Sequence, residues 1–274
     1  MAVRIISASV GIVIAVIVFF LHNTIVLPLA VSVLVAIMIF ELFRASKCEN
    51  FYVQLSVAVA YGVLKIMSYG NFLEYFMFPV CLLAVFLTFF MFIKNHKETT
   101  YQQTAFMLAV MMLIPESMLT ILKTEALDDK HGIVFLILGL CGAWIADSGA
   151  YFAGTFFGKH KLCPEISPKK TIEGFIGGIV STAVVFVLFN AVYVNFISSE
   201  HLKVNYILLA FAGAVCAVIG TVGDLSASMI KRQCGIKDYG NIMPGHGGMM
   251  DRFDSVLFVM PTFYAFLSFM DIYK

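Results

Sequence analysis

Charged side chains are scarce in this 274-residue sequence. Asp, Glu, Lys and Arg together make up 13% of it, whereas they make up about 25% of a typical soluble domain. Apolar residue types reach 61%, and the mean hydropathy is +0.93. A soluble core of this size could not bury so much apolar surface. The composition therefore excludes an ordinary soluble protein and predicts that lipid is the solvent for most of the chain.

The sequence also lacks a basic tail, a run of like charges and any paired cysteine motif. Its net charge is +1, and we expect no nucleic-acid partner. The six cysteines form no C-x-x-C pair, and no histidine stands at the spacing of a zinc finger. We therefore expect the cysteines to be reduced thiols without a metal role.

Apolar stretches of about 20 residues, the length an α-helix needs to cross a bilayer, recur along the chain. We therefore predict an all-α integral membrane protein, a single polytopic domain over residues 1–274 with about nine transmembrane helices. Lys65 lies within the third stretch, and Pro115-Glu116 interrupts the fifth. The first stretch is too long for a signal peptide and has no A-x-A site, so we expect it to be retained. The nine ranges are 5–21, 25–43, 51–69, 72–93, 104–122, 133–157, 175–196, 204–222 and 253–272.

The segments between these stretches differ in charge. If the N-terminus is cytoplasmic, most of the 18 Lys and Arg residues fall in cytoplasmic segments, as the positive-inside rule requires. Two of these segments, 158–174 and 223–254, are long, contain Gly and Pro, and are dense in ionisable residues. We therefore predict that the active-site loops lie on the cytoplasmic face.

Asp224 stands at the end of the eighth apolar stretch, directly after Gly223. An ionised Asp at membrane depth costs about 2.5–3.5 kcal/mol on insertion scales, so it needs a partner there. Two interpretations are open: a carboxylate at a helix end that is already in water, or a ligand for a metal or a transported ion.

A glycine-rich segment, residues 244–248, precedes Asp251, Arg252 and Asp254. Glycines allow backbone N–H groups to approach an anion closely. If this segment opens the last helix, Asp251 and Asp254 share one face near its N-terminus, where the helix dipole favours anionic ligands. The alternative is a plain turn with a capping Asp. Hard oxygen ligands on two segments suit Mg²⁺, so Asp224 with Asp251 is a candidate metal pair.

The other cytoplasmic segment carries Lys169 and Lys170, followed by Thr171 and Glu173, which can cap the next helix. The two lysines either touch lipid headgroups at the membrane surface or hold a phosphate in the site. Upstream, Asp147 lies within the sixth stretch beside small residues that permit close helix packing. It is interpreted either as a packing or ion-pair residue or as part of a polar cavity.

Several ordered motifs in the last half of the chain resemble those of the phosphatidate cytidylyltransferase family. The resemblance makes residues 131–274 the expected catalytic half and residues 1–130 a set of N-terminal helical spans. The matching segments are 147–154 (Asp-Ser-Gly-Ala-Tyr-Phe-Ala-Gly), 167–174 (Ser-Pro-Lys-Lys-Thr-Ile-Glu-Gly), 226–232 (Ser-Ala-Ser-Met-Ile-Lys-Arg), Lys237-Asp238, 244–248 (Pro-Gly-His-Gly-Gly) and 251–254 (Asp-Arg-Phe-Asp).

The resemblance implies an enzyme that makes CDP-diacylglycerol and pyrophosphate from CTP and phosphatidic acid. It further implies a homodimer in the bacterial inner membrane, a polar cavity open to the cytoplasm, and dependence on Mg²⁺, with a second cation left open. Asp224 and Asp251 match the metal-binding acids, and the expected catalytic residues are Asp224, Asp251, Lys170 and Asp254. The residues expected to contact substrate are Asp147, Ser148, Lys169, Lys170, Thr171, Ser226, Lys231, Arg232, His246, Gly247, Gly248 and Arg252.

In the expected reaction, a phosphatidate oxygen attacks the α-phosphorus of CTP, and the site must disperse the charge of the leaving pyrophosphate. Two other functions remain open. A CTP-dependent lipid kinase would release CDP instead. A cation-coupled transporter would use Asp147 and Asp224 as ion ligands, but the sequence shows no inverted repeat and gathers its charge on one face.

Overall fold

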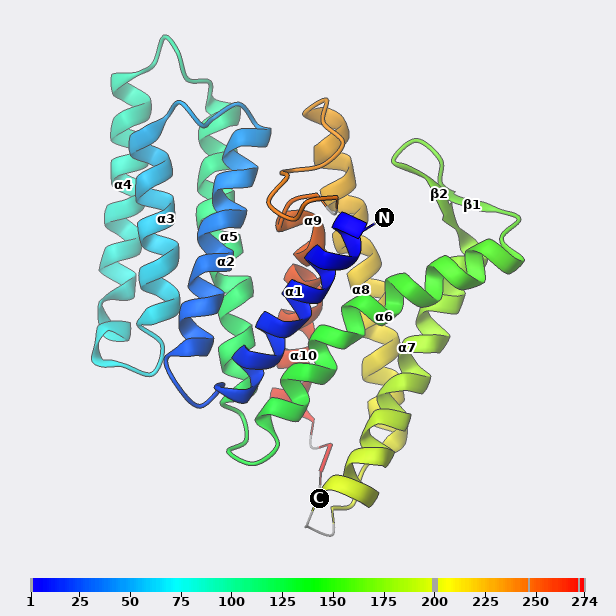
Figure 1. Cartoon of the computed structure of the whole chain (residues 1–274). Helices are drawn as coiled ribbons and strands as arrows, with labels where there is room; N and C mark the ends of the chain where they lie inside the picture. Colours follow the sequence, from blue (N-terminus) through cyan, green and yellow to red (C-terminus); the bar gives the residue numbers. More distant parts are fainter. Residues whose placement is uncertain (1, 199–201, 246, 271, 274) are drawn as a thin grey trace. The chain divides into compact units, whose positions relative to one another are not determined.

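The structure is a computed structural model that describes residues 2–198, 202–245, 247–270 and 272–273, with side chains from residue 6 onward. Its described residues are mainly helical (Figure 1). The elements are α1 (Ala2–Phe20), α2 (Val26–Ala45), α3 (Tyr52–Met67), η1 (Phe72–Phe76), α4 (Met77–Lys94), α5 (Tyr101–Glu125), α6 (Gly132–Phe157), β1 (Lys161–Cys163), β2 (Ser167–Thr171), α7 (Ile172–Val192), η2 (Tyr193–Ile197), α8 (Tyr206–Gln233), α9 (Met250–Phe253) and α10 (Val256–Phe269).

The chain forms two compact units, and each unit combines two segments that are separate in the sequence. The first unit consists of Met1–Leu122 and Gln233–Phe253, and the second of Lys123–Arg232 and Asp254–Lys274. The segment from Gln233 to Phe253, which carries the glycine-rich motif, therefore belongs with the N-terminal helices.

In the first unit, α2 to α5 stand side by side (Figure 1). Gly62 of α3 is a point of close approach. A Cβ atom there would lie 2.8 Å from Val35 of α2 and 3.2 Å from Pro115 of α5, so a larger residue would push these helices apart. The apolar side chains around it, Val35 and Ile39 among them, are fully buried.

Lys65 and Glu116, two charged residues in apolar helices of the first unit, form an ion pair. Lys65 Nζ on α3 lies 2.6 Å from Glu116 Oε1 on α5, so each charge is balanced by the other. The fifth apolar stretch, which Pro115-Glu116 interrupts in the sequence, is one continuous helix, because α5 runs through Pro115 without a break. Proline removes one backbone hydrogen bond there, a defect that packed membrane helices tolerate.

In the second unit, α6 and α7 pack closely through small residues. A Cβ on Gly177 would lie 2.1 Å from the Ala153 Cβ, and one on Gly178 would lie 2.8 Å from the Ala146 carbonyl oxygen. The expectation that small residues in 147–154 permit close helix packing is confirmed. This contact fixes the two helices on either side of the Lys170 segment.

The segment between α6 and α7 departs from the all-α prediction. Its residues form an antiparallel hairpin, in which Lys161 of β1 pairs with Thr171 of β2. The Thr171 hydroxyl then accepts a hydrogen bond of 3.1 Å from the Gly174 N–H and caps α7, as expected. The Glu173 carboxylate instead reaches back, accepting from the His160 N–H and lying 2.6 Å from His160 Nδ1. The hairpin is thereby anchored at the start of α7.

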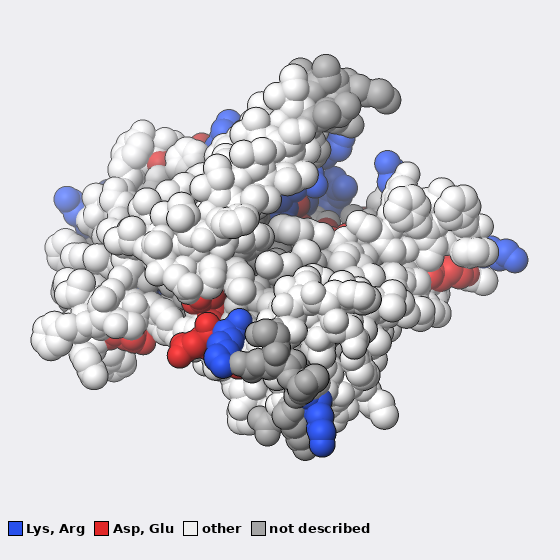
Figure 2. Space-filling model, turned by 60° about the horizontal axis from the view of Figure 1, so that its bottom comes forward, with Lys and Arg blue, Asp and Glu red and all other residues white. Residues whose placement is uncertain are grey.

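Among the described residues, six helices are long and apolar enough to cross a membrane, while Ile6–Phe20 and Tyr52–Met67 form shorter apolar helices. Figure 2 shows a surface that is mostly uncharged, with acidic and basic side chains in small groups. These features agree with an integral membrane protein, and the count of nine spans stays a prediction. The last predicted span, 253–272, contains the 14-residue α10, which at 1.5 Å per residue is about 21 Å long.

Candidate functional site

Lys170 and Asp224, both predicted to act in catalysis, form an ion pair in the second unit. Lys170 Nζ contacts Asp224 Oδ2, and each side chain is 22% exposed. Lys170 lies on β2, where neighbouring side chains point to opposite faces. Lys169 is accordingly exposed. The hairpin thus separates two lysines that look equivalent in the sequence and turns Lys170 toward the acid.

Asp224 does not end its helix as predicted. Since α8 continues to Gln233, Asp224 lies more than two turns before the helix end. Lys231 stands seven residues further along and therefore on the same face. The Ser226 hydroxyl donates to the Val222 carbonyl oxygen at 2.7 Å, and Arg232 is exposed.

Asp254 is a buried acid beside this pair, with 6% of its surface exposed. Its Oδ1 accepts a 2.8 Å hydrogen bond from the Ser255 N–H, and the Ser255 hydroxyl donates to Asp147 Oδ2 at 3.3 Å. Asp254 lies in the turn between α9 and α10, outside the six candidate spans. Burial, with the nearby carboxylates of Asp224 and Asp147, raises the pKa of Asp254 to about 7, while Lys231 acts in the opposite direction.

Five motif residues thus meet in the second unit, and we call them the acid–lysine cluster: Asp147, Lys170, Asp224, Lys231 and Asp254. Ser255, which links two of the acids, was not predicted. Its position directly after the last motif was the only signal in the sequence. The cluster contains three acids and two lysines, and the raised pKa of Asp254 reflects the crowding of the acids.

The oxygen donors of this cluster fit Mg²⁺, which prefers carboxylates, keeps several waters and binds substrate phosphates. Across the described ranges, however, no three His, Cys, Asp or Glu side chains lie close enough together to hold a metal by themselves. Asp224 and Asp251 belong to different units, so their shared role in metal binding stays a prediction.

In the first unit, Asp251 organises the glycine-rich motif. Its Oδ2 accepts hydrogen bonds from the Tyr239 N–H at 2.8 Å and from the Gly248 N–H at 3.0 Å. Gly247 has a φ of +88°, a conformation that favours glycine, and its carbonyl oxygen accepts from the Met243 N–H. We call residues 238–251 the motif loop. His246 lies outside the described residues.

The prediction that Asp251 and Asp254 share one helix face is wrong. Asp251 lies in the single-turn helix α9, which ends at Phe253, and Asp254 lies in the turn that follows. A new helix then begins at Val256. The two acids therefore belong to different elements, although three residues separate them as in a helix.

Glu41 of α2 is part of the same arrangement and was not predicted. It is 2% exposed, and its carboxylate accepts hydrogen bonds from the Met249 N–H at 2.9 Å and the Met250 N–H at 2.7 Å. A lone Glu in an apolar stretch is costly without a partner. The same argument that singled out Asp224 would have found it.

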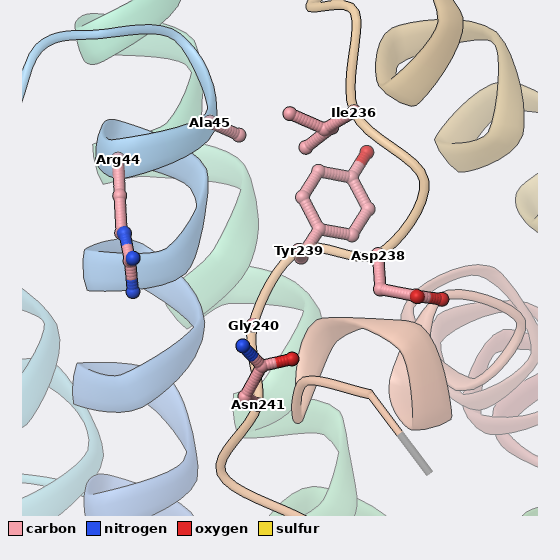
Figure 3. A pocket seen from close by; sticks show the side chains of 7 residues that line it. All are labelled: Arg44, Ala45, Ile236, Asp238, Tyr239, Gly240 and Asn241. Atoms are coloured by element: carbon pink, nitrogen blue, oxygen red, sulfur yellow. The ribbon is translucent and has the colours of Figure 1, made fainter. Parts of the chain in front are cut away.

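A small open cavity of about 170 Å³ lies between the end of α2 and the motif loop, within the first unit. Figure 3 shows Arg44 on α2 on one side and Tyr239 and Asn241 on the loop opposite. The residues that line it are Arg44, Ala45, Ile236, Asp238, Tyr239, Gly240 and Asn241. Its lining is mixed, with the Arg44 guanidinium and the Asn241 amide beside apolar side chains such as Ala45 and Ile236.

Three further predicted substrate contacts are either exposed or hydrogen-bonded to the backbone of their own helix. Ser148 is exposed, and its hydroxyl donates to the Trp144 carbonyl oxygen at 2.8 Å. Arg252 is exposed on α9. The Thr171 hydroxyl serves as a helix cap. For these residues, contact with substrate stays a prediction.

Comparison with known proteins gives consistent matches. The sequence model of the cytidylyltransferase family matches residues 2–270. A phosphatidate cytidylyltransferase of Bacillus subtilis strain 168 is 40% identical over 196 residues, which cover 72% of this chain and 68% of that protein. Proteins with the same name from Staphylococcus haemolyticus and Haemophilus influenzae are 42% and 40% identical over 132 and 142 residues. Those two alignments cover 48% of each relative, so the matched region spans about half of their length.

Proposed function

The chain belongs to the cytidylyltransferase family, and we propose that it transfers a cytidylyl group from CTP to phosphatidic acid, giving CDP-diacylglycerol and pyrophosphate. The observation that carries the proposal is the ion pair of Lys170 with Asp224 inside the acid–lysine cluster. Every member of the cluster lies within a motif that resembles the family or next to one. Asp254 and Lys231 are far apart in the sequence, but the charge of Lys231 lowers the pKa of Asp254.

The chemistry requires the site to bring two anions together and to neutralise a leaving group. A phosphomonoester is already an adequate nucleophile at neutral pH, so charge neutralisation outweighs general-base catalysis. We propose that Lys170 binds a phosphate oxygen of the substrates and that Asp224 holds Lys170 in place before they arrive. Asp147 and Ser255 then orient Asp254 beside them.

We further propose that Asp224 and Asp251 are the acids that bind Mg²⁺. A bound divalent cation supplies positive charge to the phosphates during in-line displacement. Their carboxylate oxygens are suitable donors, and the carboxylate of Asp224 lies close enough to Asp254 to raise the pKa of Asp254. Lys231, Arg232 and Arg252 are proposed to add positive charge for the triphosphate.

The chain is an integral membrane protein of a family with bacterial members. We propose that its N-terminus and the segments 158–174 and 223–254 face the cytoplasm. We also propose that it acts as a homodimer. The support for this orientation is the bias of Lys and Arg toward one set of segments. The cytoplasmic face is also the side from which CTP would reach a lipid phosphate at the membrane surface.

The test is an assay of the purified protein with labelled CTP and phosphatidate vesicles, with and without Mg²⁺. Labelled CDP-diacylglycerol and one equivalent of pyrophosphate are expected. Release of CDP with a phosphorylated lipid would identify a lipid kinase instead. Cation flux in liposomes without CTP, in the absence of any lipid product, would identify a transporter.

A further inference from the structure

We infer that Glu41, in a helix of the N-terminal half that no motif covers, is a positioning residue that holds the motif loop in its working conformation. The inference rests on the proposed function only in that the loop is proposed to contact substrate. It gives α2 a part in the reaction, where the sequence indicated only an apolar span.

The Glu41 carboxylate uses both of its oxygens on the loop. Oε1 accepts from the Met249 N–H at 2.9 Å and Oε2 from the Met250 N–H at 2.7 Å. Met250 begins α9, and the first N–H groups of a helix have no partner within it. A carboxylate that is 2% exposed requires such hydrogen bonds to remain buried. The acid and the amides therefore depend on each other.

Two glycines of the loop fit closely around this carboxylate. A Cβ on Gly240 would lie 2.3 Å from Glu41 Oε1, and a Cβ on Gly248 would lie 2.5 Å from the same atom. Both distances are shorter than any real contact of a Cβ atom. Gly247 differs, because its φ of +88° is the feature that favours glycine there. At Gly240 and Gly248, therefore, a side chain would fit only if the Glu41 carboxylate moved away from its place on the loop.

Glu41 and Asp251 together fix three consecutive backbone amides. Gly248 donates to Asp251, and Met249 and Met250 donate to Glu41. The first acid comes from α2 and the second from α9. Because Asp251 and Arg252 directly follow these amides, loss of Glu41 frees the backbone that carries them. The same loop forms one wall of the cavity beside Arg44.

The test compares Glu41→Gln with the matched control Glu116→Gln, both in detergent-purified protein. Glu116 is a glutamate of another helix in the first unit that pairs with Lys65. Glu41→Gln keeps the size of the side chain but replaces one acceptor with a donor. We expect faster hydrogen exchange at the amides of residues 248–250 in this variant alone. We also expect a rise in KM for CTP and a fall in kcat/KM of about tenfold.

Glu41→Asp keeps the two acceptors on a shorter side chain and should restore part of the lost kcat/KM. Equal exchange at residues 248–250 in Glu41→Gln and the wild type would overturn the inference, whatever the activity. A variant that loses folded protein but keeps the wild-type KM and kcat per folded molecule would also overturn it, because the role would then be structural alone. If exchange changes but the wild-type protein makes no CDP-diacylglycerol, the Glu41 contact stands and the proposed function fails.

Discussion

Lys170 of the hairpin and Asp224 of α8 form a direct ion pair, each partly shielded from water. Lys169, its neighbour in sequence, is exposed. A strand that alternates its side chains therefore gives two adjacent lysines different surroundings.

This difference predicts unequal effects of two substitutions. Lys170→Ala should lower kcat/KM by about 100-fold or more, since it removes positive charge from a site that stabilises phosphate charge. Lys169→Ala should lower kcat/KM only about a few-fold, as expected for an exposed residue near lipid headgroups. Steady-state kinetics with mixed micelles of phosphatidate measure both. Equal losses in the two variants would contradict the assignment of Lys170 to the site.

Asp224→Asn should abolish most of the activity while the protein stays folded. The change removes a carboxylate from the acid–lysine cluster, and with it the balance of charge around Lys170 and Asp254. We expect a fall in kcat of about 100-fold or more and a higher Mg²⁺ concentration for half-maximal rate.

Titration of the rate with MgCl₂ for the wild type and Asp224→Asn measures this effect. Asp129→Asn is the matched control, because Asp129 is an exposed acid of the second unit that lies outside the motifs. Wild-type turnover of Asp224→Asn at low Mg²⁺ would exclude the metal role of this residue.

Gly248→Ala should couple strongly to Glu41. In the wild type the new Cβ would overlap the Glu41 carboxylate, with a cost of about 1–3 kcal/mol from overpacking. On a Glu41→Ala background this overlap is absent, so the added cost of Gly248→Ala should be smaller. A double-mutant cycle on thermal unfolding and kcat/KM measures the coupling. Strict additivity of the two changes would show that the two residues do not touch.

Close packing of α6 on α7 predicts a stability effect without a direct change in chemistry. Gly177→Ala would place a Cβ 2.1 Å from the Ala153 Cβ and should destabilise the protein by about 1–3 kcal/mol. Gly11→Ala is the control, because its Cβ would meet only Met243 at an ordinary 3.4 Å. Thermal unfolding in detergent compares them, and an equal midpoint for both variants would contradict the packing.

Hydropathy predicted the positions of most helices because a helix in lipid must be apolar over its length. It failed at the end of α8, where helical hydrogen bonding continues through polar residues to Gln233. It also missed the hairpin. Strands of three and five residues, one of them containing Pro168, are too short to show a period of two.

The residues of the candidate site likewise fall into those that the sequence predicted and those that it did not. Motif residues such as Lys170 and Asp224 were predicted from resemblance and from the cost of charge in a membrane. The cost of charge would also have singled out Glu41, but not its partner, because its hydrogen bond to Met249 joins residues 208 positions apart. A pattern within one stretch of sequence carries no information about such a pairing. Ser255 was missed because its role depends on Asp147, 108 positions away.

The dependence of Gly240 and Gly248 on one acid in α2 has a consequence for protein engineering. The motif loop is not portable: a chimaera that grafts residues 233–253 onto another membrane scaffold must also supply an acid where Glu41 stands. Without it, the transplanted glycines would surround an empty space, and the amides at the start of α9 would have no acceptor. Recombination between distant homologues should therefore succeed only when the parent that supplies α2 has an acid at the position of Glu41.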